Sequence, residues 1–380
     1  MHTENKENCT GCGACFNICP QNAIRMIYND YGFYVPEIDK EECINCGLCE
    51  KVCPLDNYKS DNFENPKVYA FQNDDKEILY KCASGGAFAK LAKIVLEQNG
   101  IVYGVIYDKN MIVCHSRCDS LNELEKMYSS KYVQSDTRQT FKQTKGDLEN
   151  GKQVLYSGTA CQIAGLKSYL QKDYENLITV DLVCHGVPSP LVFKKYKQEI
   201  EKILKNGDKI LNIDFRSKIN GWNPYSLEIK TKNQNINISS NQSYYLKLFL
   251  NNLNINTSCL NCQFNGFPRI ADLTFGDFWG VDEYDKNLND NMGLSVIIVN
   301  SDKGQSVFNN MQDICKEVPL DVVVKYNPNI VSSSNANIKR EEFFEYIKKG
   351  KSLNYCVKKY FKEHFYIKVK TFIKNLLKIS

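Results

Sequence analysis

The stretch that decides the fold at the start of this chain is CTGCGACFNICP, residues 9–20, which recurs as CINCGLCEKVCP at residues 43–54. Both segments have the spacing C-x2-C-x2-C-x3-C-P. In this pattern three cysteines wrap one tight loop round a 4Fe-4S cluster, and the fourth, just before a proline, reaches a second cluster. The repeat therefore predicts a small module over residues 1–57 that holds two 4Fe-4S clusters.

The eight cysteines divide into two predicted ligand sets in an α+β ferredoxin-like two-cluster module. The first set is Cys9, Cys12, Cys15 and Cys53. The second set is Cys43, Cys46, Cys49 and Cys19. Zinc is the alternative metal because it also takes four thiolates, but zinc motifs normally offer two separated C-x2-C pairs. The two runs of four with a trailing proline favour iron and sulfide.

Composition indicates the setting of this module. The chain has 380 residues, a net charge of +4 and 17 cysteines. Its length suits two domains, and so small a net charge makes no case for nucleic acid as a partner. The polar start shows no secretory signal, and no apolar run is long enough to span a bilayer, so we expect a cytoplasmic protein. In a reducing compartment, dense cysteine indicates metal or redox chemistry rather than disulfides.

The rest of the chain alternates strands with helices. We expect a linker at 58–66, then a larger α/β domain with a mixed, partly parallel sheet, because strand–helix–strand units imply parallel strands. Its first part covers 67–150 and its second part 151–325, followed by a helical, basic, amphipathic tail at 326–380. Residues 209–232 read as two antiparallel strands, and the Asn-rich stretch 233–241 as an exposed loop.

Four further cysteines suggest a third cluster. Cys161 and Cys184 each follow a predicted strand, and the carboxyl ends of parallel strands meet at one edge of a sheet. Cys259 and Cys262 add a C-x2-C pair that needs two more thiolates to complete a cluster. The alternatives are a zinc site, or buried cysteines that act as small apolar residues. The other cysteines are interpreted as structural: Cys82, Cys114, Cys118, Cys315 and Cys356.

Two features are compatible with a phosphate-containing ligand. Ser84, Gly85 and Gly86 precede a predicted helix, where Ser84 would act as the cap and the glycines would let a phosphate approach the helix N-terminus. Close backbone packing is an equally good reason for two glycines. Lys131 would meet a phosphate or a flavin ring, although an isolated lysine is more often a solvated surface charge.

The motifs together resemble the beta subunits of the coenzyme F420 (deazaflavin) hydrogenases and dehydrogenases. Chlorophyll-ring reductases are similar over the same region. The resemblance covers residues 9 to about 299 and is carried by motifs that occur in this order: Ser84-Gly85-Gly86, SKYVQS at 130–135, GTACQ at 158–162, CHGVP at 184–188, Cys259-x2-Cys262 and DLTFGDFWG at 272–280. The chain departs from the family at Ala160, where the family usually has proline, and at Ser129, which replaces part of an Arg-Gly pair.

The resemblance implies FAD in the α/β domain beside the third cluster. On this basis we assign cofactor binding to Ser84, Gly85, Gly86, Lys131 and Thr159. We assign catalysis to His185, as a proton donor, and to Asp277. A hydrogen bond to the backbone is the competing role for His185, and core packing is the competing role for Trp279 near Asp277.

The predicted function is that of an iron–sulfur flavoprotein oxidoreductase. Electrons would pass from a ferredoxin or another redox protein through the 4Fe-4S clusters to FAD, and on to a small organic two-electron acceptor, either the deazaflavin coenzyme or another substrate. The alternatives are a non-catalytic electron-transfer subunit that serves a partner enzyme, and a redox sensor or scaffold. The basic tail from Lys358 would contact a membrane surface, a partner or its own domain.

Overall fold

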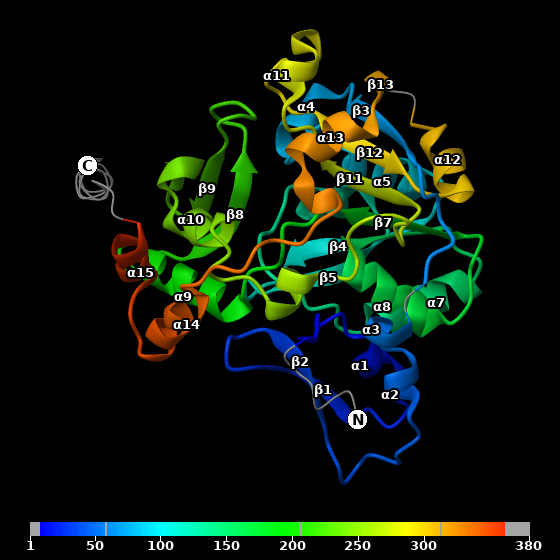
Figure 1. Ribbon diagram of the computed structural model, residues 1–380, viewed down its shortest axis with the longest axis horizontal. Coiled ribbons are helices and arrows are strands. Elements are labelled where there is room, and N and C mark those ends of the chain that lie inside the picture. The colour runs from blue at the N-terminus through cyan, green and yellow to red at the C-terminus, as the bar shows by residue number, and fades with distance from the viewer. Residues whose placement is uncertain (1–7, 58, 205–206, 312–313, 362–380) are drawn as a thin grey trace.

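The computed structural model describes residues 8–57, 59–204, 207–311 and 314–361 (Figure 1). A small module lies at the N-terminal end, drawn in blue, and the larger part of the chain forms mixed α/β structure above it. Of the basic stretch that begins at Lys358, the part from residue 362 onward lies outside the described residues.

The N-terminal module has two cysteine loops on either side of a hairpin. Strands β1 and β2 pair antiparallel, with Ile24 opposite Ile38. Each loop leads into a short helix through a glycine with positive φ, Gly13 at 81° and Gly47 at 72°, a conformation that glycine adopts without steric cost. The elements are α1 (Ala14–Ile18), β1 (Ile24–Tyr28), β2 (Tyr34–Ile38), α2 (Leu48–Lys51) and α3 (Pro54–Asn57).

The main sheet is mixed and partly parallel, as predicted. Its strand order is β13-β3-β12-β11-β7-β6-β4-β5. Strands β4, β6, β7 and β11 run parallel to one another, and the remaining neighbours pair antiparallel. The strands are β3 (Lys67–Gln72), β4 (Ile101–Tyr107), β5 (Val113–Cys118), β6 (Val154–Thr159), β7 (Leu177–Leu182), β11 (Leu273–Asp277), β12 (Ser295–Val299) and β13 (Ile314–Val318).

Helices cover both faces of this sheet. Tyr103 and Tyr156 face the core beneath α7 and α8, while Val102 and Leu155 face the core beneath α5 and α12. The alternation follows from the two-residue period of a strand. The helices of this region are α4 (Lys76–Lys81), α5 (Ala87–Glu97), α6 (Leu121–Leu124), α7 (Thr140–Glu149), α8 (Ala160–Leu170), α11 (Val281–Tyr284), α12 (Asp302–Phe308) and α13 (Leu320–Tyr326).

The N-terminal module packs on the α7 and α8 layer. Cys12, Ala14 and Val52 of the module share one apolar core with Phe141 of α7 and Ile163 of α8. Burial of apolar surface, worth roughly 25 cal/mol per Å², therefore attaches the module to the helices that cover the sheet. This contact fixes where the cysteine loops stand relative to the α/β domain.

A second, three-stranded sheet corrects one prediction. Strands β8 (Ile210–Ser217) and β9 (Ser226–Thr231) form the expected antiparallel pair, but β10 (Asn235–Ser239) occupies the stretch expected to be a loop. In β10, Ile236 and Ile238 are buried while the alternate residues Asn235 and Asn237 are exposed. The two-residue alternation of a half-buried strand is present there, and the asparagine content concealed it.

Helices beside the small sheet complete the described chain. They are α9 (Pro190–Glu201), α10 (Tyr244–Leu250), α14 (Arg340–Lys348) and α15 (Leu353–Tyr360). Their apolar faces form one core with β8, β9 and β10. Over the residues that the structure describes, no helix has the length and apolar character required to cross a bilayer.

Candidate iron–sulfur and cofactor site

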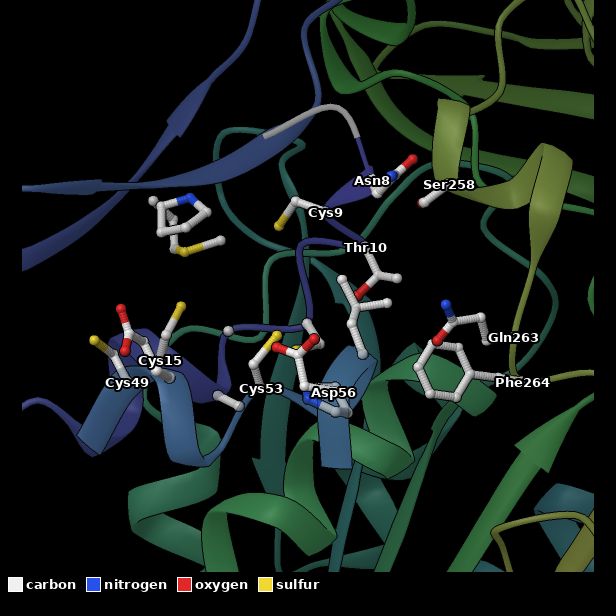
Figure 2. Close-up of a pocket in the computed structure, with 18 of the residues that line it drawn as sticks. Asn8, Cys9, Thr10, Cys15, Cys49, Cys53, Asp56, Ser258, Gln263 and Phe264 are labelled. Atoms are coloured by element: carbon white, nitrogen blue, oxygen red, sulfur yellow. The ribbon is translucent and has the colours of Figure 1, made fainter. Parts of the chain in front are cut away.

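Four cysteines of the N-terminal module line one pocket. Cys9, Cys12, Cys15 and Cys53 all line it, and Cys49 lines it as well. Figure 2 shows the thiols of Cys9, Cys15 and Cys53 facing a shared space, with Asp56 beside them. These four are the predicted ligands of the first cluster, and the pocket gives a cluster a place between them.

A second pocket lies within the same module. Cys19, Cys43, Cys46 and Cys49 line it, together with Pro20 and the loop around Ile44. These are the four predicted ligands of the other cluster. Each pocket thus takes three cysteines from one run and the fourth from the other, which is the crossed arrangement that the spacing predicts. Among the described residues, no three His, Cys, Asp or Glu side chains lie close enough to hold a single metal ion.

Burial determines the protonation of these thiols. Burial is the main cause that raises the pKa of Cys12 to about 12 and that of Cys9 to about 11, and neighbouring thiols contribute to both increases. Without a bound cation these thiols are protonated near neutral pH. Thiolates are the form that binds metal, so cluster binding would release protons here.

The four cysteines of the predicted third site come together from three segments. Cys161 stands in the first turn of α8, directly after β6, and Cys184 follows the end of β7. Cys259 lies on a 3-10 helix, Thr257–Asn261, and Cys262 ends it. Burial raises the pKa of Cys161, and the thiols of Cys259, Cys184 and Cys262 raise it further. The Cys161 thiol therefore lies close enough to the other three thiols to interact with them electrostatically.

Buried polar contacts hold this site in position. The Arg269 guanidinium forms an ion pair with Asp181 on β7, with Nη2 to Oδ2 at 3.0 Å, and both side chains are buried. The backbone N–H of Cys262 donates to Ser333 Oγ at 2.8 Å. Thr159 caps α8, and its Oγ1 lies 3.1 Å from Cys161 Sγ. This ion pair and these hydrogen bonds therefore hold the segments that carry the cysteines in position.

The structure corrects the expected role of Ser84. The N-cap residue of α5 is Gly86, at φ 80°, and no side chain caps this helix. The Ser84 hydroxyl instead donates to the carbonyl of Leu294 at 2.8 Å. A Cβ on Gly85 would come within 2.4 Å of Ser295 N, so close backbone packing accounts for this glycine. The sequence pattern had left that alternative open.

Lys131 is partly buried rather than a solvated surface charge. Its ammonium donates to the carbonyls of Tyr128 and Ser129, and burial lowers its pKa to about 8. A second lysine, Lys218 on the segment after β8, donates to the carbonyl of Ser84 at 2.6 Å, and burial lowers its pKa to about 8 as well. Sequence analysis missed Lys218 because a lysine at a strand end gives no signal of burial. Cys82 interacts electrostatically with both lysines.

Asp277 ends β11 and is held in an ion pair. Arg216 donates to its two carboxylate oxygens at 2.8 and 3.1 Å, and the Arg216 side chain is only 2% exposed. Trp279 stacks on Trp222 at 4.9 Å, with Arg216 on the ring of Trp279 at 5.1 Å. Trp279 also packs against a buried apolar cluster, which agrees with the competing role of core packing. Arg216 is a further residue of this edge that the sequence did not reveal.

His185 follows Cys184 and packs edge-on against Phe249. Its Nε2 atom is buried and has no hydrogen-bond partner among the described residues. His185 Nε2 therefore does not make the hydrogen bond to the backbone that was the competing role for this side chain. A polar atom of a ligand would satisfy it.

Comparison with known proteins agrees with this geometry. Residues 151–319 match a family described as the C terminus of the beta subunit of coenzyme F420 hydrogenase/dehydrogenase, and residues 8–57 match the 4Fe-4S dicluster domain. No curated protein matches the chain. A chain of the F420-reducing NiFe hydrogenase complex from Methanosarcina barkeri, from a study of xenon derivatization, is 15% identical. That likeness has a TM-score of 0.46 and covers 77% of this chain and 95% of the other, and a score below 0.5 does not establish a shared fold.

The matched domains fit the two groups of cysteines described above. The dicluster domain contains both runs of four, and the beta-subunit region contains Cys161, Cys184, Cys259 and Cys262. The chain therefore carries a 4Fe-4S dicluster domain at residues 8–57 and, at residues 151–319, a domain that matches the C terminus of the coenzyme F420 hydrogenase/dehydrogenase beta subunit, which together identify it as an iron–sulfur electron-transfer protein.

Proposed function

We propose that this protein is an iron–sulfur flavoprotein oxidoreductase. It would take electrons singly from a ferredoxin or a similar redox protein and deliver them in pairs to a small organic acceptor, either the deazaflavin coenzyme or another planar substrate. The observation that carries the proposal is the gathering of Cys161, Cys184, Cys259 and Cys262 at the edge where the parallel strands end. An α/β protein builds its sites at this edge.

Three sets of cysteines would hold the clusters. The module supplies one set around each of its two pockets, and the four cysteines at the sheet edge supply the third. The buried Arg269 would place positive charge near the third set. Its charge lowers the pKa of the Cys184 thiol, although burial raises the pKa of this thiol to about 12 overall. A cationic neighbour stabilises thiolates, which is the form needed to bind iron.

FAD would lie along the same edge, between the third cysteine set and the start of α5. The residues present fit such a group: Gly86 opens an 11-residue helix, and the ammonium groups of Lys131 and Lys218 supply positive charge for its phosphates. When bound, a flavin joins one-electron chemistry to two-electron chemistry. Thr159 stands where β6 ends and would lie between the cluster ligands and the flavin.

The residues first assigned to catalysis have different surroundings. Asp277 is fully engaged by Arg216, so we propose that it holds the guanidinium in place beside Trp279. His185 has a free Nε2 atom, which we propose contacts a polar atom of the bound acceptor or cofactor. Neither assignment requires the carboxylate of Asp277 to transfer a proton.

The second candidate function is a non-catalytic relay to a partner enzyme. The dicluster domain favours it because such a module is sufficient for electron transfer. A relay requires clusters only. Lys131 and Lys218 at the sheet edge would then have no anionic ligand to bind. The presence of a tightly bound flavin distinguishes the two functions.

The test is the identity of the flavin released from protein purified without oxygen. One FAD per chain, reduced by a chemically reduced ferredoxin and reoxidised by added deazaflavin coenzyme or another organic acceptor, would support the enzyme. Iron without flavin would contradict the oxidoreductase and leave the relay. A Lys218→Met variant, which removes a buried cation, should retain its iron but bind FAD more weakly.

A further inference from the structure

The two cysteine pockets of the N-terminal module have different neighbours. The pocket of Cys9, Cys12, Cys15 and Cys53 is also lined by Ser258, Asn261, Gln263 and Phe264, which belong to the segment that carries Cys259 and Cys262 (Figure 2). The pocket of Cys19, Cys43, Cys46 and Cys49 is lined by residues of the module alone. We call them the inner site and the outer site.

Direct contacts connect the inner site to the third cysteine set. A Cβ on Gly165 of α8 would lie 2.8 Å from Cys12 Sγ, so the backbone of α8 touches this thiol side chain. Cys161 stands four residues earlier on the same helix, a rise of about 6 Å. Asn256 donates from Nδ2 to the carbonyl of Cys9 at 3.1 Å, three residues before Cys259. Two of the three segments that supply the third set therefore contact the inner site.

Further hydrogen bonds fix the inner loop on the α/β domain. Thr137 Oγ1 donates to the carbonyl of Cys12 at 3.0 Å, and Gln134 Nε2 donates to the carbonyl of Thr10 at 3.0 Å. Gln134 Oε1 in turn accepts the backbone N–H of Tyr34 on β2. Gln134 and Thr137 are buried, so these bonds form in a setting where unpaired groups are costly. The inner site has a fixed position relative to the third set.

The outer site faces solvent. Cys46 is exposed, Ile44 is 60% exposed, and Asn45 beside them is exposed as well. The loop that carries them lies on the side of the module away from the main sheet, as Figure 1 shows. A donor protein can approach the outer site closely, whereas the α/β domain covers part of the inner one.

We propose that the two sites of the module act in a fixed order, which rests on the proposed function above. One electron at a time enters at Cys19, Cys43, Cys46 and Cys49 from a one-electron donor, which is oxidised by one electron. It leaves the module at Cys9, Cys12, Cys15 and Cys53 for the set at Cys161, Cys184, Cys259 and Cys262. Two such transfers supply the pair that the organic acceptor takes up. Gly165 and Asn256 are positioning residues for the second transfer.

The test is the magnetic coupling between reduced sites, measured by electron paramagnetic resonance on the full chain after its iron and flavin have been counted. The signal of the third set is identified by its loss in Cys161→Ala. That signal should lose its broadening in Cys15→Ala, which disables the inner site, and keep it in Cys46→Ala, which disables the outer site. Broadening that depends on Cys46 and not on Cys15 would overturn the order.

A pair of glycine variants keeps the proposal testable if a cysteine variant loses the whole module. Gly165→Ala places a methyl group against Cys12 and should weaken the broadening. Gly146→Ala, on α7, adds the same methyl group where no atom lies within 4 Å and should leave it unchanged. Equal broadening in both variants would overturn the proposal. A wild-type protein that lacks the third signal and its iron contradicts the proposed function itself, and the order with it.

Discussion

The N-terminal module and the proposed third site assemble their cysteines by different means. The module takes all eight cysteines from residues 9–53, and short loops bring them together. The third set spans residues 161–262, and its members meet only because β6 and β7 are parallel neighbours and a 3-10 helix packs against their ends. A site made of local loops depends on spacing, whereas one made of distant segments depends on the stability of the whole domain.

The largest expected effect comes from breaking the buried ion pair beneath the third set. Arg269→Met would leave Asp181 buried without its partner, which costs about 3–5 kcal/mol in the free energy of unfolding. Because Asp181 lies three residues before Cys184, the third set should lose its iron while the module keeps about eight irons per chain. Iron analysis and thermal unfolding measure both effects.

A surface ion pair provides the matched control. Lys316→Met removes the partner of Asp285, where the lysine side chain is 47% exposed, and should leave the free energy of unfolding almost unchanged because solvent screens the pair. If Arg269→Met lost iron from the module as readily as from the third set, the two regions would not be independent.

Protonation of His115 at low pH should lower the free energy of unfolding of the α/β domain. This side chain is buried; its Nε2–H donates to the carbonyl of Ser157 at 3.1 Å and its Nδ1 accepts from Ser135, so the ring is neutral. Burial lowers its pKa to about 4, below the 6.5 of the unfolded chain. The stability it contributes is complete above pH 6.5 and falls as the pH drops toward 4, by about 2 kcal/mol at pH 5.

Thermal unfolding at pH 7.5 and pH 5 tests this prediction. The wild type should lose more stability on acidification than His115→Gln, whose amide can make both hydrogen bonds without titrating. The module contains no histidine between residues 8 and 57, so its unfolding should not show this component. Equal losses in the two proteins would show that His115 does not titrate on unfolding.

The smallest expected effect concerns the cap of α8. Thr159→Ala removes the capping box that Thr159 forms with Gln162 and should cost about 1 kcal/mol. It also removes the hydroxyl 3.1 Å from Cys161 Sγ, so the spectrum of the third set should change while those of the module do not. Thr159→Ser keeps the hydroxyl and is the control; an identical change in both variants would exclude the hydroxyl as the cause.

The comparison also explains what the sequence could predict. Spacing along the chain predicted the fold class of the N-terminal module and the crossed sets of cysteines at its two pockets, because those cysteines lie in local loops. The edge rule for parallel strands led to Cys161 and Cys184, which the structure brings together with Cys259 and Cys262. Arg216 and Lys218 were missed because their burial results from the packing of the small sheet against the main one.

Errors arose where a local preference competed with tertiary contacts. Serine is a good cap in general, but the carbonyl of Leu294 takes the hydroxyl of Ser84 and Gly86 begins the helix. Asparagine favours loops, yet Ile236 and Ile238 find a core and make that stretch a strand. In both cases a partner distant in sequence decided the outcome.

The most direct test of the central claim, that distant segments assemble a third cluster site, is an iron and sulfide count on protein purified without oxygen. We expect about twelve irons per chain in the wild type and about eight in a Cys259→Ala/Cys262→Ala variant, with the spectra of the module unchanged. About eight irons in both proteins would contradict it and leave the N-terminal module as the whole of the iron–sulfur machinery.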